Sequence, residues 1–317
     1  MTILALTLFL AASPIRPVHT YSIVARDPAT GELGVAVQSH WFSVGSVVPW
    51  AEAGVGAVAT QSIVDPSYGP LGISLMRAGR SAPEALRALL AGDSGREVRQ
   101  VGMVDAEGRV ATHTGTLCIP AAGGQEGRQY VVQANLMEKP SVWPAMARAF
   151  EAAKGDLAER LLAALDAAEG EGGDIRGRQS AALLVVKGKS TGRPWADRLF
   201  DLRVEDHPVP LKELRRLTQM QRAYNHMSAG DDCVAAKDWA CAEREYGTAR
   251  KLEPESAEMA FWNGVALATN GQLEAARPLF AQAFRAEPRW RELIRRLPDV
   301  DQLPKDPKLL EAILAIR

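Results

Sequence analysis

The sequence predicts an α+β protein in which sheets are stacked between helices, followed by an all-α region. Up to about residue 210, β-rich runs and pairs of amphipathic helices occur in separate groups rather than in strict alternation, which is typical of segregated sheet and helix layers. Beyond that point the helical pattern continues without strands. The 317 residues also exceed the commonest size of one domain. We therefore expect a leader over residues 1–19 and two domains, residues 20–217 and 218–317.

The first predicted element is a hairpin. Two β-rich runs, residues 20–27 and 33–40, flank a turn that contains Pro28 and Gly31. Side chains of a strand alternate between its faces, so Thr20 stands at the mouth of a buried strand pair. Further strands are expected at 53–61, 101–105, 109–114, 130–135, 181–186 and 200–204. The last of these alternates cleanly, and its polar face predicts an edge strand.

Four helices are expected between these strands, at residues 71–78, 81–90, 142–153 and 157–168. The second has the clearest start signal. Ser81 is a good N-cap, a proline follows in the first turn, and Glu84 completes a capping box.

The region after Leu211 contains a sequence repeat. At an offset of 34 residues, small, aromatic and proline positions coincide in the pairs Gly230 and Gly264, Ala242 and Ala276, Tyr246 and Phe280, Ala249 and Ala283, Pro254 and Pro288. That period is typical of tetratricopeptide repeats, which use such arrays to bind protein partners. Residues 211–217 and 307–316 are expected to be packing or capping helices. The alternative is an unrelated pair of helical hairpins.

Composition disfavours several functions. The net charge is −1 and no run of Lys or Arg forms a basic patch, so nucleic acid is not an expected partner. Neither metal-ligand spacing nor a phosphate-binding glycine loop occurs, so we expect no metal and no cofactor. Of the three cysteines, Cys233 and Cys241 are interpreted as small buried apolar residues. The alternative is that these two form a disulfide, if the protein is exported.

The leader resembles an export signal. Residues 3–12 form an apolar run of signal-peptide length that is too short to span a bilayer, and the small residues Ala11 and Ser13 fit cleavage after Ser13. We therefore expect an exported protein, periplasmic or secreted, without a membrane span. The run lacks a preceding Lys or Arg, so a misassigned start codon or a cytoplasmic extension is the alternative. Cleavage after Ser13 would leave residues 14–19 in front of Thr20.

Thr20 is the first catalytic candidate. A hydroxyl residue that begins a strand directly after a removable segment has the arrangement of an N-terminal nucleophile, because the freed α-amine can act as base for its own side chain. The alternative is an ordinary threonine at a strand end. Ser39 and His40 close the second strand, where Ser39 could polarise the Thr20 amine and His40 could face a substrate; solvent exposure at a strand end is the alternative for both.

Ordered motifs occupy residues 20–28, 34–39, 48–51, 54–61, 66–69, 113–115 and 177–183, and the first of them begins Thr20-Tyr21-Ser22-Ile23. From Thr20 to about residue 217, these motifs resemble the bacterial domain of unknown function 1028 family. The resemblance implies a four-layer αββα sandwich of the Ntn-hydrolase-like superfamily, which cleaves amide bonds with an N-terminal Thr, Ser or Cys. It implies no substrate, and self-association is a further expectation from it. Family members often carry only Met before the Thr, whereas this chain has a leader.

The resemblance adds two catalytic candidates. An acidic residue and a serine near such a buried strand support the N-terminal amine in the wider superfamily, and Asp174 and Ser180 are similar here. Arg178 could bind a substrate carboxylate, or could instead anchor its loop by a salt bridge. His113 and Asn135 end strands and could donate to an oxyanion, or could satisfy loop backbone.

Three functions are consistent with these features. The first is an exported Ntn-type amidohydrolase that acts on a small amide or peptide, with Thr20 as nucleophile and the repeats recruiting a protein partner. The second is a catalytically silent binding module that acts through the repeats. The third is a cell-envelope scaffold whose N-terminal domain senses a small ligand. A free α-amine on Thr20 separates the first from the others.

Overall fold

The computed structural model describes residues 20–317, so the expected signal peptide lies outside the described residues. The chain divides into two compact units between Arg215 and Arg216, which we call the N-terminal unit and the helical unit. Within residues 20–317, every helix is too short or too polar to cross a membrane.

The larger sheet of the N-terminal unit has six strands in the order β10-β9-β2-β1-β8-β7, and all neighbours are antiparallel. Its strands are β1 (Thr20–Arg26), β2 (Leu33–Ser39), β7 (Gly123–Gly127), β8 (Tyr130–Ala134), β9 (Ser180–Val186) and β10 (Arg198–Val204). The predicted hairpin is confirmed as β1 and β2, and β10 is an edge strand as expected. Strand β7 was not predicted, because Gly-Gly-Gln-Glu-Gly has low strand propensity and only its pairing with β8 orders it.

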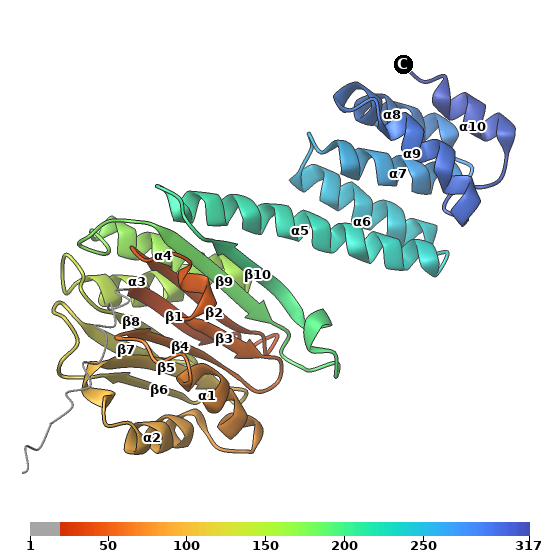
Figure 1. The fold of residues 1–317 in the computed structure, drawn as a ribbon. Helices are drawn as coiled ribbons and strands as arrows, with labels where there is room; N and C mark the ends of the chain where they lie inside the picture. The colour runs from red at the N-terminus through yellow and green to blue at the C-terminus, as the bar shows by residue number, and fades with distance from the viewer. Residues whose placement is uncertain (1–19) are drawn as a thin grey trace, which may run out of the picture. The chain divides into compact units, whose positions relative to one another are not determined.

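The smaller sheet has four strands in the order β3-β4-β5-β6. They are β3 (Pro49–Glu52), β4 (Gly56–Ser62), β5 (Arg99–Asp105) and β6 (Val110–Thr114). Strand β1 packs against β4 and β5, so the two sheets face each other (Figure 1). Small and β-branched side chains fill the space between them, among them Val24, Val35, Ala57, Ala59 and Val131. The Ala-rich β4 allows this close approach of the sheets.

Helices cover the outer faces of both sheets. Helices α3 (Val142–Ala152) and α4 (Leu157–Gly170) pack on the six-stranded sheet, and α1 (Tyr68–Arg77) and α2 (Ala82–Gly92) pack on the four-stranded one. The predicted capping box of α2 is confirmed, with Ser81 and Glu84 bonded reciprocally. Helix α1 begins three residues before the expected position 71, because the bend at Asp65, which accepts from the amide of Ser67, leads directly into the helix.

Short 3-10 turns occur at Val44–Ser46, Arg96–Val98, Pro194–Ala196 and Leu297–Val300. The first of them follows β2, and the amide of Val44 in it donates to Ser180.

The helical unit contains successive antiparallel helices. They are the end of α5 (Pro210–Ala235), α6 (Trp239–Leu252), α7 (Ala257–Thr269), α8 (Leu273–Ala286), α9 (Trp290–Arg296) and α10 (Pro307–Leu314). The expected separate helix at 211–217 is wrong: those residues belong to the 26-residue α5. No glycine or proline interrupts residues 211–229, so nothing in the sequence ends the helix there. Helix α10 packs on α8 and α9 at the end of the unit.

Equivalent residues make equivalent contacts in the two helix pairs. Gly230 of α5 lies against the ring of Tyr246 in α6, and Gly264 of α7 lies against the ring of Phe280 in α8. The alanines at the matching positions 242, 276, 249 and 283 are buried. The period of 34 residues in the sequence is therefore also a period in the packing.

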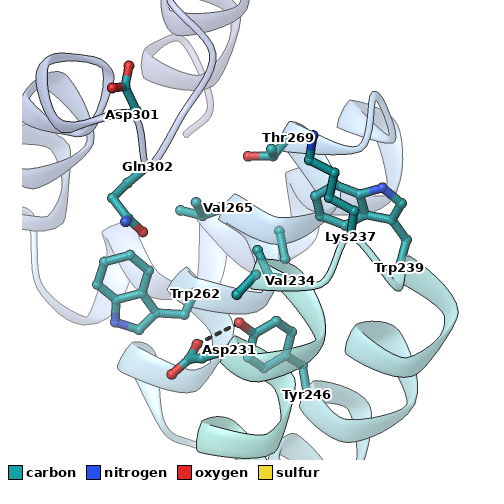
Figure 2. Close-up of a pocket in the computed structure, with 12 residues that line it drawn as sticks. Asp231, Val234, Lys237, Trp239, Tyr246, Trp262, Val265, Thr269, Asp301 and Gln302 are labelled. Carbon is teal, nitrogen blue, oxygen red and sulfur yellow. Dashed lines mark hydrogen bonds between the residues drawn. The ribbon is translucent and has the colours of Figure 1, made fainter.

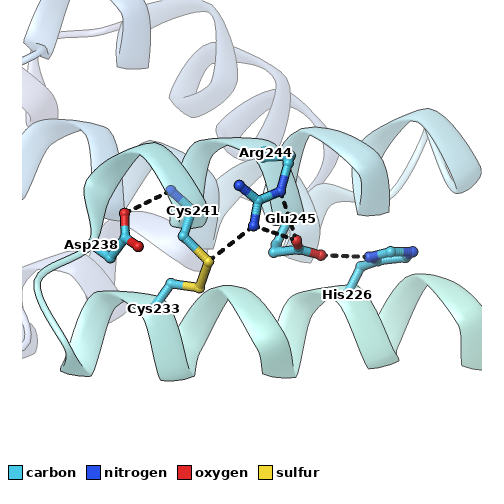
Figure 3. The surroundings of a disulfide bond; sticks show 6 residues. All are labelled: His226, Cys233, Asp238, Cys241, Arg244 and Glu245. Atoms are coloured by element: carbon cyan, nitrogen blue, oxygen red, sulfur yellow. Dashed lines mark hydrogen bonds and ion pairs between the residues drawn. A yellow bond between two sulfur atoms is a disulfide. The ribbon is translucent and has the colours of Figure 1, made fainter.

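A disulfide joins Cys233, near the end of α5, to Cys241, near the start of α6, with the Cα atoms 5.7 Å apart (Figure 3). The interpretation of these two cysteines as buried apolar residues is therefore wrong: both are partly exposed, and the tight turn between the helices brings them together. A guanidinium nitrogen of Arg244 lies 3.3 Å from the Cys241 sulfur. Cys118, in the N-terminal unit, is a buried free thiol.

Candidate active site

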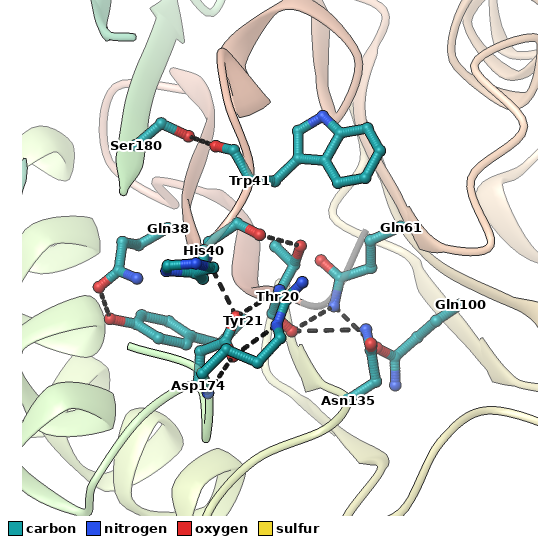
Figure 4. Close-up of polar contacts among 12 residues, drawn as sticks. Thr20, Tyr21, Gln38, His40, Trp41, Gln61, Gln100, Asn135, Asp174 and Ser180 are labelled. Carbon is teal, nitrogen blue, oxygen red and sulfur yellow. Dashed lines mark hydrogen bonds and ion pairs between the residues drawn. The ribbon is translucent and has the colours of Figure 1, made fainter. Parts of the chain in front are cut away.

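Thr20 begins the central strand of the larger sheet, between β2 and β8. The residue is fully buried. Antiparallel pairing places Ser39 directly opposite, and the Thr20 hydroxyl donates to the Ser39 hydroxyl across 3.1 Å (Figure 4). Two of the catalytic candidates thus lie side by side, because the β1–β2 turn sets the register of the hairpin.

The main-chain carbonyl of Thr20 accepts three hydrogen bonds. The backbone amide of Asn135 donates across 3.1 Å, its side-chain amide lies at 3.5 Å, and the side chain of Gln61 donates across 3.0 Å. Asn135 follows β8, whereas Gln61 lies on β4 of the facing sheet. The candidate oxyanion donor Asn135 therefore holds the main chain of Thr20, and its side chain also donates to Gln100 across 2.9 Å.

The polar cluster extends along the interface between the sheets. Ser22 donates to the Gln61 side chain across 2.7 Å, and Gln133 donates to Ser22 across 3.2 Å. Sequence reasoning did not single out Gln61, Gln100 or Gln133. The signal that could have found them is a glutamine in each of three otherwise apolar or small-residue strands, because buried amides require partners.

Asp174 holds the backbone at the end of β2. Its carboxylate accepts from the backbone amide of His40 across 3.0 Å and from the guanidinium of Arg176 across 2.7 Å. Figure 4 shows His40, Asp174 and Thr20 at the same end of the strands. Within residues 20–317, Nδ1 of His40 is buried without a hydrogen-bond partner.

Ser180 lies opposite Ser39 at the start of β9. Its hydroxyl donates to the carbonyl of Trp41 and accepts from the amide of Val44 across 3.1 Å. Ser180 thus fixes the turn that leaves β2, and its support of a free Thr20 amine stays a prediction.

Arg178 belongs to a second cluster, on the helix side of the larger sheet. It forms an ion pair with Glu169 of α4, and the hydroxyl of Tyr21 donates to the same carboxylate across 2.5 Å. Burial, and then the negative charge of Glu169, raise the pKa of Tyr21 well above its ordinary value, so the phenol stays protonated. Tyr21 and Thr20 point to opposite faces of β1, so this cluster and its adjoining cavity of about 390 Å³ lie behind the strand from Thr20.

His113 is directed away from this network. Its Nε2 lies 2.8 Å from the carbonyl of Arg96, at the outer side of β6. The neighbouring Thr114 faces inward, and its hydroxyl accepts from Gln100 across 2.9 Å. Of the two residues, Thr114 rather than the candidate His113 therefore belongs to the network around Thr20.

Among residues 20–317, His, Cys, Asp and Glu side chains do not form a group of three or more that could hold a metal ion.

Fold and site together define an α+β protein with a hydroxyl residue at the head of its central strand, followed by a helical region. The chain belongs to the family of unknown function DUF1028, whose model matches residues 20–214. The crystal structure of protein SPO2555 from Silicibacter pomeroyi, of the same family, is 32% identical, with a TM-score of 0.57 over 63% of this chain and 88% of that chain. No curated protein matches the sequence. The resemblance found from the motifs is thus confirmed at the level of the family.

Proposed function

We propose that the protein is an exported Ntn-type amidohydrolase that cleaves a C–N amide bond with Thr20 as N-terminal nucleophile. The observation that carries the proposal is the placement of Thr20 at the head of the central strand, with its hydroxyl on Ser39 and its carbonyl held by Asn135 and Gln61. Two facing sheets between helix layers are also the architecture expected of an Ntn-hydrolase-like αββα sandwich.

The chemistry needs only groups of Thr20 and water. The free α-amine takes the proton of Oγ, and Oγ attacks the amide carbonyl carbon to form a C–O bond. The C–N bond then breaks, and the leaving amine takes the proton from the α-ammonium group. Water, deprotonated by the same amine, hydrolyses the resulting ester and returns the hydroxyl. An unperturbed α-amine has a pKa of about 8, close to what a general base at neutral pH requires.

This mechanism requires a chain that begins at Thr20. Signal cleavage after Ser13 would leave residues 14–19 in place, so we propose a second trimming step after export. Without that step the nitrogen of Thr20 is a peptide nitrogen and cannot act as a base.

A second candidate function is partner binding by the helical unit, which we propose to consist of two tetratricopeptide repeats. It is supported by a cavity of about 470 Å³ between α5, α7 and the segment before α10. Trp262, Val265 and Tyr246 contribute rings and an apolar side chain to its lining, and Lys237 and Gln302 contribute polar groups from two sides (Figure 2). Aromatic anchors beside polar groups suit a peptide segment. In a catalytically silent protein this site alone would carry the function.

The test compares three preparations on a panel of amide substrates: protein that begins at Pro14, protein that begins at Thr20, and Thr20→Ala in the second form. We expect turnover only from the second, and Thr20→Ser should retain part of it because the hydroxyl remains. Periodate, which cleaves an N-terminal 1,2-amino alcohol, serves as the control for a free Thr20 amine. Equal rates in the three preparations would remove Thr20 from the mechanism, and no turnover in any would favour the binding protein.

A further inference from the structure

The interior of the sandwich is polar at one end. Gln61, Gln100 and Asn135 are fully buried there, whereas mostly small and β-branched apolar side chains fill much of the remaining space between the sheets. A buried amide that lacks partners costs roughly 1–3 kcal/mol, so three of them are tolerated only when they satisfy one another. Their position next to Thr20 indicates a role beyond packing.

Gln100 is the residue that these groups share. Its Oε1 accepts from Gln61 across 2.7 Å and from Asn135 across 2.9 Å. Its Nε2 lies 2.9 Å from the carbonyl of Ala134, 2.9 Å from the hydroxyl of Thr114 and 3.2 Å from the carbonyl of Gly123. A primary amide has two acceptor sites and two N–H groups, so the whole capacity of Gln100 is used.

Both residues that donate to Gln100 also donate to the carbonyl of Thr20. Gln100 therefore orients Gln61 from the smaller sheet and Asn135 from the larger sheet toward one oxygen atom. Fixing that oxygen fixes the peptide plane after Thr20 and the axis of the Cα–C bond, and the contact between Thr20 Oγ and Ser39 then limits rotation about this axis. The two together set the positions of the nitrogen and Oγ, between which the proton passes.

We propose that Gln100 is a positioning residue that sets the orientation of Thr20 through Gln61 and Asn135. The inference rests on the proposed role of Thr20 as nucleophile. A displacement of about 1 Å in a reacting group can cost a factor of about 100 in rate, so loss of this support should slow the reaction of Thr20 without removing it.

The main variant is Gln100→Leu, which keeps the volume and removes both hydrogen-bonding ends. Met103→Leu is the control, because Met103 is fully buried on the same strand β5 but packs against α1 and α2 on the other face of the strand, away from Thr20. If Gln100→Leu does not fold, Gln100→Glu replaces it: the shape and an acceptor oxygen remain, but an oxygen now faces the carbonyls of Ala134 and Gly123.

The first readout is acylation by an alkyl β-lactone, measured from the intact mass of the protein. The chains used run from Thr20 to Arg317. Thr20 Oγ attacks the lactone carbonyl, the ring C–O bond breaks, and the Oγ proton ends on the released oxygen, so the product gains the whole mass of the lactone. We expect Gln100→Leu to be acylated about 10- to 100-fold more slowly and Met103→Leu within about 3-fold of the unsubstituted protein. Equal rates in the two variants would overturn the role of Gln100.

The second readout is hydrogen exchange at the Asn135 amide, which donates to the Thr20 carbonyl and reports this contact without any reaction. In Gln100→Leu it should exchange faster relative to Val131 and Val132 in the middle of β8, and in Met103→Leu it should not. Uniformly faster exchange along β8 in both variants would mean a structural role only. If Thr20→Ala is acylated as fast as the unsubstituted protein, the proposed function fails, while the exchange data still decide whether Gln100 orients Thr20.

Discussion

At the scale of single residues, the contact that matters most is between two hydroxyl groups. Thr20 Oγ1 donates to Ser39 Oγ inside the protein, where both residues are fully buried. A hydrogen bond in such surroundings holds the two oxygen atoms in place. Either hydroxyl of such a pair can donate, so in the proposed mechanism Ser39 donates to Thr20 Oγ while the Thr20 proton passes to the α-amine. Ser39 is thus a positioning residue for the nucleophile in the proposed mechanism.

Replacing Ser39 by alanine should lower the rate of Thr20 acylation about 3- to 10-fold, the equivalent of one hydrogen bond of about 1 kcal/mol. The measurement is the β-lactone reaction of chains that begin at Thr20. Ser180→Ala is the control, since its hydroxyl bonds the turn residues Trp41 and Val44. A rate in Ser39→Ala that equals the unsubstituted rate would show that this contact does not orient Thr20.

At the scale of elements, one carboxylate joins three parts of the smaller sheet and its helices. Asp93, at the end of α2, accepts from the hydroxyl of Tyr68 in α1 across 3.0 Å and from the guanidinium of Arg99 in β5 across 2.9 Å. Burial alone would raise the pKa of Asp93, but the bonds from Arg99, the amide of Gly95 and Tyr68 outweigh it and lower this pKa.

A lowered pKa in the folded state stabilises the protein above the pKa of the unfolded state, near 4, and this stabilisation disappears as the pH falls through the folded pKa. Asp93→Asn should therefore destabilise the N-terminal unit by about 2 kcal/mol at pH 7. The difference from the unsubstituted protein should shrink below pH 4. Urea unfolding at pH 7, 5 and 3 measures it, and a difference that stays constant with pH would contradict this assignment.

The glycines of the helical unit provide a comparison between a packed and an open position. A Cβ at Gly230 would lie 2.5 Å from the Tyr246 ring, whose hydroxyl is held by Asp231, whereas a Cβ at Gly247 meets no atom of the described chain within 4 Å. Gly230→Ala should destabilise the helical unit by about 1–3 kcal/mol. Gly247→Ala should stabilise it by up to about 1 kcal/mol, because alanine favours helix. Thermal unfolding followed by circular dichroism tests the pair, and shifts of the same sign would disprove the close contact.

At the scale of the whole molecule, the chain is two compact units joined by the continuous helix α5. Each has its own apolar core: the sheets and their helices in one, and α7 to α10 around Phe261 and Phe280 in the other. Separate cores are expected to unfold separately.

We therefore expect residues 20–217 to fold without the rest of the chain and to give a cooperative thermal transition. In the full chain, reduction of the Cys233–Cys241 disulfide should lower the stability of the helical unit alone, by roughly 2–3 kcal/mol for a loop of this length. Calorimetry with and without reductant distinguishes the transitions, with Cys233→Ser as a control that should not respond to reductant. Aggregation of residues 20–217, or an equal effect on both transitions, would refute independent units.

Much of the fold and part of the site could be predicted from local sequence. The turn at residues 28–32 pairs β1 with β2, and that pairing alone brings Ser39 to Thr20. The capping signal of Ser81 and the 34-residue period likewise act over a turn or between neighbouring helices, where short contacts leave a pattern in the chain.

Only the tertiary structure decided which residues surround Thr20. Gln61 and Gln100 lie on two strands of the smaller sheet, and Asn135 follows a strand of the larger one. Gln61 is 41 residues from Thr20 and 39 from Gln100, and Asn135 is 115 residues from Thr20, so no local pattern connects them. Local sequence also does not show that Thr114, rather than His113, bonds the network around Thr20. That depends on which face of β6 the opposite sheet covers. Local periodicity determines elements and their pairing, whereas the packing of one sheet on another determines which buried polar groups meet.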